Sequence, residues 1–324
     1  MPQMRDNIWR SGHGHGTDHE HGSDYEHGAD AHADDGRPRI AFIGAGRVGT
    51  ALGVALARAG WQVTAVASRD EERRRLFQER VAGARAFADA HAVLDEADLI
   101  FLTVPDDAIA VVAADLHLYS GQALVHTSGA LPASVLAPAM AAGTSIGSFH
   151  PLVAFAELER AVADLRGATV AIEGDDSLLP LLAELAESVG AQPVTLPEGG
   201  KAAYHAAAMM AAGGVIGLFD AIARVAVLAG LDERTAVAVY APLTRQALAN
   251  AERLGIDAAL TGPLLRGDVG TVKDHLEVLR ALAPDTLPLY VAVARREIEI
   301  ARRRGDLDPE RADQMEDLLN LPSG

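Results

Sequence analysis

The sequence contains no cysteine, and of its 28 basic residues only Lys201 and Lys273 are lysines. Without thiols the chain cannot form disulfides, bind a metal through thiolates or use a cysteine nucleophile, and a reducing compartment is compatible with it. The net charge of -17 argues against nucleic acid and anionic membranes as partners, because their phosphate groups repel such a surface. An anionic ligand therefore has to be bound by a local group of donors.

Hydrophobic runs of the length that crosses a bilayer are not found either. The longest apolar run, residues 206–219, lies between His205 and Asp220 and is shorter than the roughly 18 to 20 residues of a span. We therefore expect a buried helix here, central to a second domain or to a dimer interface, and no membrane partner. The start of the chain is polar and lacks the apolar stretch of a signal peptide, so the expected location is the cytoplasm.

Residues 1–37 differ in composition from the rest of the chain. This segment holds six of the twelve histidines among Gly, Asp and Glu, and it has almost nothing apolar to bury. It is predicted to be a disordered tail, since it cannot form a core. Its imidazoles could bind Zn²⁺, Ni²⁺ or Cu²⁺, or the segment could be a solvated extension without a ligand. No metal site is predicted elsewhere.

A glycine turn between a strand and a helix opens the folded part. Residues 40–43 are apolar, GAGRVG follows, and a helical pattern leads to a second apolar strand. In this βαβ unit Gly44 permits the tight turn, Gly46 lets the backbone approach a pyrophosphate, and Gly49 allows close packing of helix on strand. The N-H groups of the helix start favour phosphate binding, although a Rossmann-shaped domain with an empty site is the alternative. The candidate cofactor-binding residues of the turn are Gly44, Ala45, Gly46, Arg47, Val48 and Gly49.

The end of the second strand indicates which dinucleotide binds. NAD sites usually have Asp or Glu here for the ribose hydroxyls, whereas this chain has Ser68 and Arg69, followed by arginines 73–75. Arginine offers charge-assisted, paired donors to a 2'-phosphate, so NADP is favoured over NAD. The alternative is that Asp70 caps the next helix and the arginines form its solvated face.

The remaining pattern predicts an α/β fold with a doubly wound, mostly parallel Rossmann sheet, followed by an all-helical C-terminal domain. Strands alternate with helices up to about residue 198, and after residue 200 only helical patterns follow, interrupted by a Gly- and Pro-rich loop at 260–276. We assign residues 38–198 to the Rossmann domain and 199–324 to a helical substrate or dimerisation domain. Ligands of such sheets bind at the carboxyl ends of the strands, in the loops TVPDD, HTSGA and FHPLVAF.

Lys201 stands where a cation is disfavoured. At the first turn of a helix it opposes the macrodipole by roughly 0.3–1 kcal/mol where exposed. Burial and the positive helix end both lower the pKa of the ammonium group, as a general acid near neutral pH requires, and arginine could not be deprotonated. His205, four residues later on the same face, can donate to the same substrate atom or orient it. Alternatively, Lys201 is exposed beside the flexible Gly-Gly pair and His205 is a core histidine.

Five segments between about residues 40 and 277 carry a family resemblance: GAGRVG, HTSGAL, GSFHPL, KAAYHAA and LTGPLLRGD. With them the chain resembles Rossmann-like proteins with a DUF2520-type C-terminal domain, relatives of the β-hydroxyacid dehydrogenases, ketopantoate reductases and pyrroline-5-carboxylate reductases. The resemblance implies an NAD(P)-dependent oxidoreductase with a 6-phosphogluconate dehydrogenase-like helical domain that forms a homodimer. Lys201 matches the lysine of the hydroxyacid dehydrogenases, whereas His205 replaces their asparagine. Tyr204 and His205 match the DUF2520 pattern itself, but Ala212, Gly213 and Gly214 depart from its usual Ser-Asn pair.

Together these features predict that NADPH reduces the carbonyl carbon of a small 2-oxo or 3-oxo acid, with a ketopantoate-like substrate suggested by the resemblance alone. The nicotinamide is expected near Val104, Pro105 and Ser128. Lys201 would protonate the developing alkoxide while His205 positions it.

The substrate carboxylate is expected to bind the Ser128 hydroxyl and the Gly129 N-H, with His150 beside them and Arg266 as a clamp from the same or a neighbouring subunit. His150 could instead close a turn, and Arg266 could pair with Asp268. Two other functions remain open. One is an imine reductase that needs no lysine acid, and the other is a non-catalytic protein that senses NADPH or carries metal on its tail.

Overall fold

The computed structural model describes residues 36–140 and 143–320, so the histidines of the predicted tail and any metal site there lie outside the described residues. The chain divides into two compact units, of which the first ends at Ala208 and the second begins at Met209. The division falls within a helix, and the first two turns of that helix belong to the sheet-containing unit because Lys201 and Tyr204 contact strand residues there.

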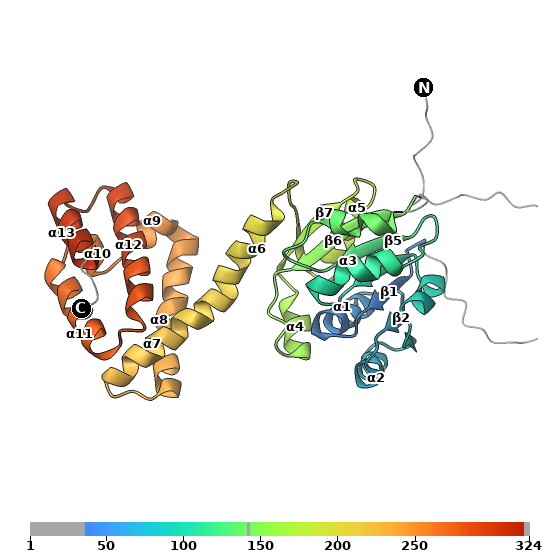
Figure 1. The fold of residues 1–324 in the computed structure, drawn as a ribbon, viewed down its shortest axis with the longest axis horizontal. Coiled ribbons are helices and arrows are strands. Elements are labelled where there is room, and N and C mark those ends of the chain that lie inside the picture. The colour runs from blue at the N-terminus through green and yellow to red at the C-terminus, as the bar shows by residue number, and fades with distance from the viewer. Residues whose placement is uncertain (1–35, 141–142, 321–324) are drawn as a thin grey trace, which may run out of the picture. The chain divides into compact units, whose positions relative to one another are not determined.

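The first unit is built on an eight-stranded sheet of order β3-β2-β1-β4-β5-β6-β7-β8 (Figure 1). All neighbouring strands are parallel except β6 and β7, which confirms the predicted mostly parallel, doubly wound sheet. Each strand predicted from the sequence is present, and β3 is an edge strand that the apolar pattern did not indicate. The strands are β1 (Ile40–Ile43), β2 (Val63–Ala67), β3 (Arg85–Phe87), β4 (Leu99–Leu102), β5 (Ala123–His126), β6 (Ser145–Pro151), β7 (Thr169–Gly174) and β8 (Gln192–Thr195).

Helices cover both faces of this sheet, which is why its central strands are apolar at every position. Phe42 and Phe101 lie in one core with Leu182, whereas Ile43 and Leu102 lie in the other core. Successive residues of one strand thus point to opposite faces. The covering elements are α1 (Arg47–Arg58), α2 (Glu71–Arg80), η1 (His91–Glu96), α3 (Asp106–Asp115), η2 (Ala133–Ala139), α4 (Leu158–Asp164) and α5 (Leu179–Ser188).

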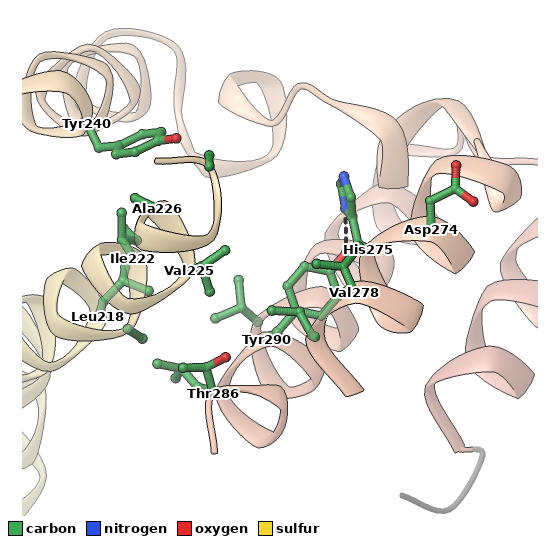
Figure 2. A pocket seen from close by; sticks show the side chains of 15 residues that line it. Leu218, Ile222, Val225, Ala226, Tyr240, Asp274, His275, Val278, Thr286 and Tyr290 are labelled. Carbon is green, nitrogen blue, oxygen red and sulfur yellow. Dashed lines mark hydrogen bonds between the residues drawn. The ribbon is translucent and has the colours of Figure 1, made fainter. Parts of the chain in front are cut away.

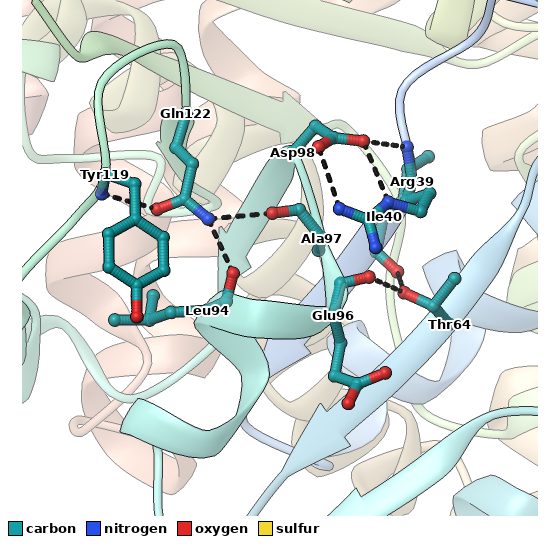
Figure 3. Close-up of polar contacts among 9 residues, drawn as sticks. All are labelled: Arg39, Ile40, Thr64, Leu94, Glu96, Ala97, Asp98, Tyr119 and Gln122. Carbon is teal, nitrogen blue, oxygen red and sulfur yellow. Dashed lines mark hydrogen bonds and ion pairs between the residues drawn. The ribbon is translucent and has the colours of Figure 1, made fainter.

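The amino-terminal edge of the sheet is closed by internal hydrogen bonds (Figure 3). The Arg39 guanidinium donates to the Asp98 carboxylate at 3.0 and 3.2 Å, and the Gln122 amide donates to the carbonyls of Leu94 and Ala97 at 2.7 and 2.8 Å. These side chains satisfy one another and join the starts of β1, β4 and β5. The polar side chains at this edge therefore stabilise the fold, and a ligand site is expected at the carboxyl edge.

The second unit consists of helices around a core of its own that includes Leu276, Ile298 and Met315. The predicted change to an all-helical pattern is therefore present. Its elements are η3 (Met210–Gly214), a π-helical turn, followed by α7 (Val215–Leu228), α8 (Glu233–Leu254), α9 (Ile256–Ala259), α10 (Pro263–Arg266), α11 (Val269–Leu282), α12 (Leu287–Arg304) and α13 (Pro309–Asn320), while α6 (Lys201–Met209) precedes them.

The long apolar helix differs from the prediction. The helix from Lys201 to Leu228 has 28 residues, and its most apolar 18-residue window has a mean hydropathy of 1.8. It is long and apolar enough to cross a membrane by length and composition alone. The count of unbroken apolar residues missed this because Asp220 interrupts the run, although Asp220 pairs with Arg224 at 2.8 Å. Only 11% of its most apolar window is buried, so the helix is not buried within a single chain, and its place in a dimer interface stays a prediction. Periodicity indicates that a face is apolar, but it cannot say what covers that face.

Candidate functional site

The glycine turn has the geometry that a bound pyrophosphate requires. Gly44 has a φ of +114°, and a Cβ on Gly49 would lie 2.3 Å from the Gly44 carbonyl oxygen and 2.4 Å from Thr103 Oγ1. A Cβ on Gly46, by contrast, would meet nothing closer than 4.0 Å, so this residue faces open space. No side chain caps α1, and the N-H groups of its first turn are available to an anion. The residues 44–49 thus fit a dinucleotide.

The arginines that follow β2 differ in their contacts. Asp70 caps α2 by accepting from the Arg73 N-H at 3.1 Å and also pairs with the Arg73 guanidinium, as the alternative interpretation expected. Arg75 pairs with Glu79 at 2.7 Å. Arg69 is exposed and makes no ion pair within residues 36–140 or 143–320. Arg74 donates to the Ser68 carbonyl oxygen at 2.5 Å and makes no ion pair within the described residues. Ser68, Arg69 and Arg74 therefore remain the residues of this segment that could hold a 2'-phosphate.

A single row of residues runs along the carboxyl edge of the sheet. The strand register aligns Ile43 at the end of β1 with Leu102, Leu102 with His126, His126 with Ser148, and Ser148 with Glu173. Registered neighbours point to the same face, so the side chains of the last three form one polar group that begins at the carboxyl end of β5, two strands from β1. Val104 and Pro105 follow β4 directly at the same edge, with Val104 half-buried and Pro105 exposed.

The loop after β5 holds its own serine firmly. Ser128 Oγ donates to Asp106 Oδ2 at 2.7 Å and accepts from the N-H groups of Ala130 and Leu131, both at 3.1 Å. The hydroxyl predicted to hold a substrate carboxylate is thus engaged within the protein. Asp106 was not predicted as a site residue, although it begins α3 directly after the TVP segment that was expected to line the site.

Lys201 is buried at the head of α6, with 3% of its surface exposed, and its Nζ donates to Ser148 Oγ on β6. Burial lowers the pKa of Lys201 from 10.5 to about 8, while the carboxylates of Glu173 and Asp106 oppose this change. A large fraction of this amine is therefore protonated at pH 7, and it can release its proton near that pH.

Two further histidines meet the loop after β5. A Cβ on Gly129 would lie 2.3 Å from His205 Nδ1 and 2.7 Å from His150 Nε2, so only glycine fits between these rings. His150 Nδ1 lies 3.2 Å from the Tyr204 hydroxyl. Burial, followed by Lys201 and His205, lowers the pKa of His150 to about 4, and burial raises the pKa of Tyr204 to about 12. Both side chains are therefore neutral at pH 7, and Tyr204 can donate to His150.

The structure thus brings together Gly129, His150, Lys201 and His205 within the first unit. Arg266 ends α10 in the second unit, where it is exposed. Asp268, its alternative partner, caps α11 by accepting from the Thr271 N-H at 3.2 Å. The pKa of Asp268 is lowered first by its hydrogen bonds with Thr271 and also by the charge of Arg266.

Several polar residues of this group were missed from the sequence. Ser148 lies two residues before His150 on one strand, so the alternation of strand side chains places both on the same face. Glu173 and Asp106 could have been found as acids next to strand ends. His126 is fully buried, and its pKa is lowered to about 4 by burial first and by Lys201 second. Only the strand register shows that His126, Ser148 and Glu173 lie in one row.

The architecture and the glycine turn define a Rossmann dinucleotide-binding domain joined to a helical domain. Comparison with family models gives two matches: a Rossmann-like domain at residues 26–151 and the domain of unknown function DUF2520 at residues 168–297. The chain therefore matches a Rossmann-like domain model and a DUF2520 domain model in succession, which confirms the resemblance seen in the motifs. No curated protein matches it in sequence.

Solved structures similar to the chain include two that are about a quarter identical to it. A candidate NADP oxidoreductase from Bacteroides fragilis is 25% identical with a TM-score of 0.67, and covers 81% of this chain and 98% of its own. A Thermotoga maritima protein is 27% identical with a TM-score of 0.64, over 82% of this chain and 98% of its own. The pyrroline-5-carboxylate reductase of Streptococcus pyogenes shares the fold at 16% identity, with a TM-score of 0.59, over 83% of this chain and 99% of its own.

Proposed function

We propose that this protein is an NADP-dependent oxidoreductase that reduces the carbonyl group of a small oxo acid, with Lys201 as proton donor. The observation that carries the proposal is the buried Lys201 amine, which contacts Ser148. Ser148 lies in the row of registered strand residues that starts at the end of β1, where the glycine turn begins. The Bacteroides relative, named as a candidate NADP oxidoreductase, supports the same class of reaction.

The reduction requires one hydride and one proton, which NADPH and Lys201 would supply. NADPH supplies a hydride to the carbonyl carbon when it is bound. As the C-O double bond becomes a single bond, its oxygen takes a proton from the Lys201 ammonium group, and the amine regains a proton from water. His205 is four residues further along the same helix and would orient the oxygen, while the neutral His150 and the Gly129 N-H would bind the substrate's carboxylate.

Reduction of an imine is the second candidate, and one observation favours it. Asp106 binds Ser128 within the candidate site, and its carboxylate would attract a cationic iminium and repel a carboxylate substrate. The likeness to a reductive aminase from Aspergillus terreus, 16% identical with a TM-score of 0.61, is one of fold. An imine nitrogen is already basic and would not need the Lys201 proton.

The experiment that tests the proposal is NADPH oxidation with a panel of 2-oxo and 3-oxo acids, run beside cyclic imines and mixtures of ketone and amine. Deuteride transfer from 4-deuterated NADPH to the product, followed by mass spectrometry, establishes direct reduction. Turnover of oxo acids alone supports the proposal, and turnover of imines alone transfers the assignment to the second candidate. Tight NADPH binding with no turnover on either panel would favour a sensing protein.

The preference for NADP over NAD is assigned to Ser68 and Arg69. Replacing Arg69 with alanine is expected to weaken NADPH binding roughly ten- to hundredfold, because a charge-assisted contact contributes about 1.5–3 kcal/mol, and to leave NADH binding nearly unchanged. Titration of cofactor fluorescence measures both constants. Arg75→Ala is the matched control, since Arg75 is already paired with Glu79. An equal loss for both cofactors in Arg69→Ala would contradict the assignment.

We further propose that a second copy of the chain covers the apolar surface of the second unit. A cavity of about 520 Å³ lies between α7, α11 and α12, and Figure 2 shows the side chains of Leu218, Ile222 and Val225 facing it. Its lining is almost wholly apolar, and exposed apolar residues extend along α7 and α8. An apolar surface of this kind marks an interface. One copy offers both the apolar helix and the groove, as a symmetric dimer requires.

Replacing Ile216 with glutamate is expected to shift the protein from dimer to monomer, because the variant would bury an unpaired charge in the interface. Ile216 is 72% exposed in the single chain. The matched control is Val111→Glu on α3 of the first unit, where the side chain is 71% exposed. Sedimentation equilibrium distinguishes the two forms, and a wild-type monomer at tens of micromolar would refute the dimer.

A further inference from the structure

Lys201 is held where its charge is disfavoured, and a nearby anion is needed to explain why it stays protonated. It is almost fully buried, and it begins a helix, so both its surroundings and the helix dipole oppose an ammonium group. The charged groups that act on it are Glu173 from β7 and Asp106 from the start of α3. The imidazoles that face it, His126 on β5 and His150 on β6, are neutral.

Of the two carboxylates, only Glu173 has a buried oxygen without a hydrogen-bond partner among the described residues. Asp106 lies in an exposed position and already accepts from Ser128. Glu173 Oε1 accepts from the Ala133 N-H at 3.2 Å, whereas Glu173 Oε2 is buried and has no hydrogen-bond partner among the described residues. A buried carboxylate oxygen without a partner is costly to the fold, so its presence calls for a function.

The sheet places Glu173 beside the group that Lys201 contacts. Ser148 and Glu173 are directly paired residues of the antiparallel strands β6 and β7, so their side chains leave the same face as neighbours. The Lys201 ammonium donates to Ser148 Oγ. We propose that Glu173 is a positioning residue which, together with the Ser148 hydroxyl, anchors the Lys201 ammonium group and keeps it charged for proton donation. The inference rests on the proposed role of Lys201 and adds the residue that controls it.

The near absence of lysine makes a direct measurement possible. Lys201 and Lys273 are the only lysines of the chain, so a protein labelled with ¹³C at lysine Cε gives two signals whose chemical shifts report each amine's protonation. Lys273 is exposed and pairs with Glu277, and serves as the internal reference. In Glu173→Gln, which keeps an oxygen for the Ala133 N-H, the Lys201 midpoint should move to lower pH by roughly one pH unit. The Lys273 midpoint should not move.

Asp175→Asn is the matched control. Asp175 directly follows β7, and its carboxylate also accepts from a backbone N-H, that of Ile146 at 2.9 Å. Asp175→Asn should leave the Lys201 midpoint unchanged. Glu173→Asp keeps a carboxylate, so its Lys201 midpoint should lie close to that of the unmodified protein. If Glu173→Gln does not fold, Ser148→Ala tests the same anchor and should also lower the midpoint. An unchanged midpoint, or an equal change in Asp175→Asn, would overturn the inference. This measurement needs no substrate, so it tests the role of Glu173 even if none of the oxo acids is reduced. If both proposals hold, the pH dependence of turnover in each variant should shift together with its Lys201 midpoint.

Discussion

Lys201→Met is expected to lower the turnover number for carbonyl reduction by roughly 10²–10⁴-fold, the usual contribution of a positioned general acid. Methionine fills a similar volume in the buried site but cannot donate a proton. The binding of NADPH should change little, because the glycine turn and the residues after β2 are untouched. Steady-state turnover with the best oxo acid, together with a cofactor titration, separates these two effects.

The pH dependence of the reduction rate gives a second test of Lys201 as the proton donor. The donor is the protonated amine, and the Lys201 pKa is about 8, so reduction should be constant below that pH and fall about tenfold per pH unit above it. In Lys201→Arg this decline should disappear along with most of the activity, since guanidinium does not release a proton in this range.

Lys273→Arg provides the control, because it changes the other lysine of the chain at an exposed site on α11. Its rate and its pH profile should match those of the unmodified protein. A Lys201→Met protein that retains carbonyl reduction within a few-fold would refute the proposed proton donor. Loss of carbonyl reduction with retained imine reduction would show that the amine serves only the former reaction.

The fold could be predicted from the sequence because its signals are local. The apolar strands, the glycine turn and the alternation of strand and helix are each contained in a few consecutive residues, and the strands they predict are present. The edge strand β3 was missed because it has three residues and carries an exposed Arg85. The exposure of the helix from Lys201 in the single chain could not be predicted, because its burial depends on what lies outside the chain.

The site could be predicted only in part, for the same physical reason. The glycines stand out because they form a known motif between a strand and a helix, and Lys201 stands out because a cation is disfavoured at the start of a helix. Glu173 and Ser148 look ordinary along the chain, and their pairing arises from the antiparallel register of β6 and β7, which no local pattern specifies. Ser128 was correctly located after β5, but its bond to Asp106 is a contact across 22 positions of the sequence.

Alanine substitutions at Gly46 and Gly49 are expected to separate cofactor binding from folding. At Gly46 the backbone is extended, with φ −77° and ψ −173°, and a Cβ would meet only open space within the protein. Gly46→Ala should therefore fold with a loss of at most about 1 kcal/mol at the helix cap. Its methyl group would occupy the path of the pyrophosphate, so NADPH affinity should fall at least about tenfold.

Gly49→Ala should lose stability as well as affinity. Its Cβ would lie 2.3 Å from the backbone carbonyl of Gly44 and 2.4 Å from Thr103 Oγ1, and neither atom is the end of a flexible side chain. The helix must move away from β1 and β4, at a cost of about 1–3 kcal/mol, which corresponds to a fall in melting temperature of roughly 2–12 °C. Calorimetry with and without NADPH measures both properties. If Gly46→Ala binds NADPH as tightly as the unmodified protein, the Rossmann domain does not hold its dinucleotide at this turn, and the alternative of an empty site would apply.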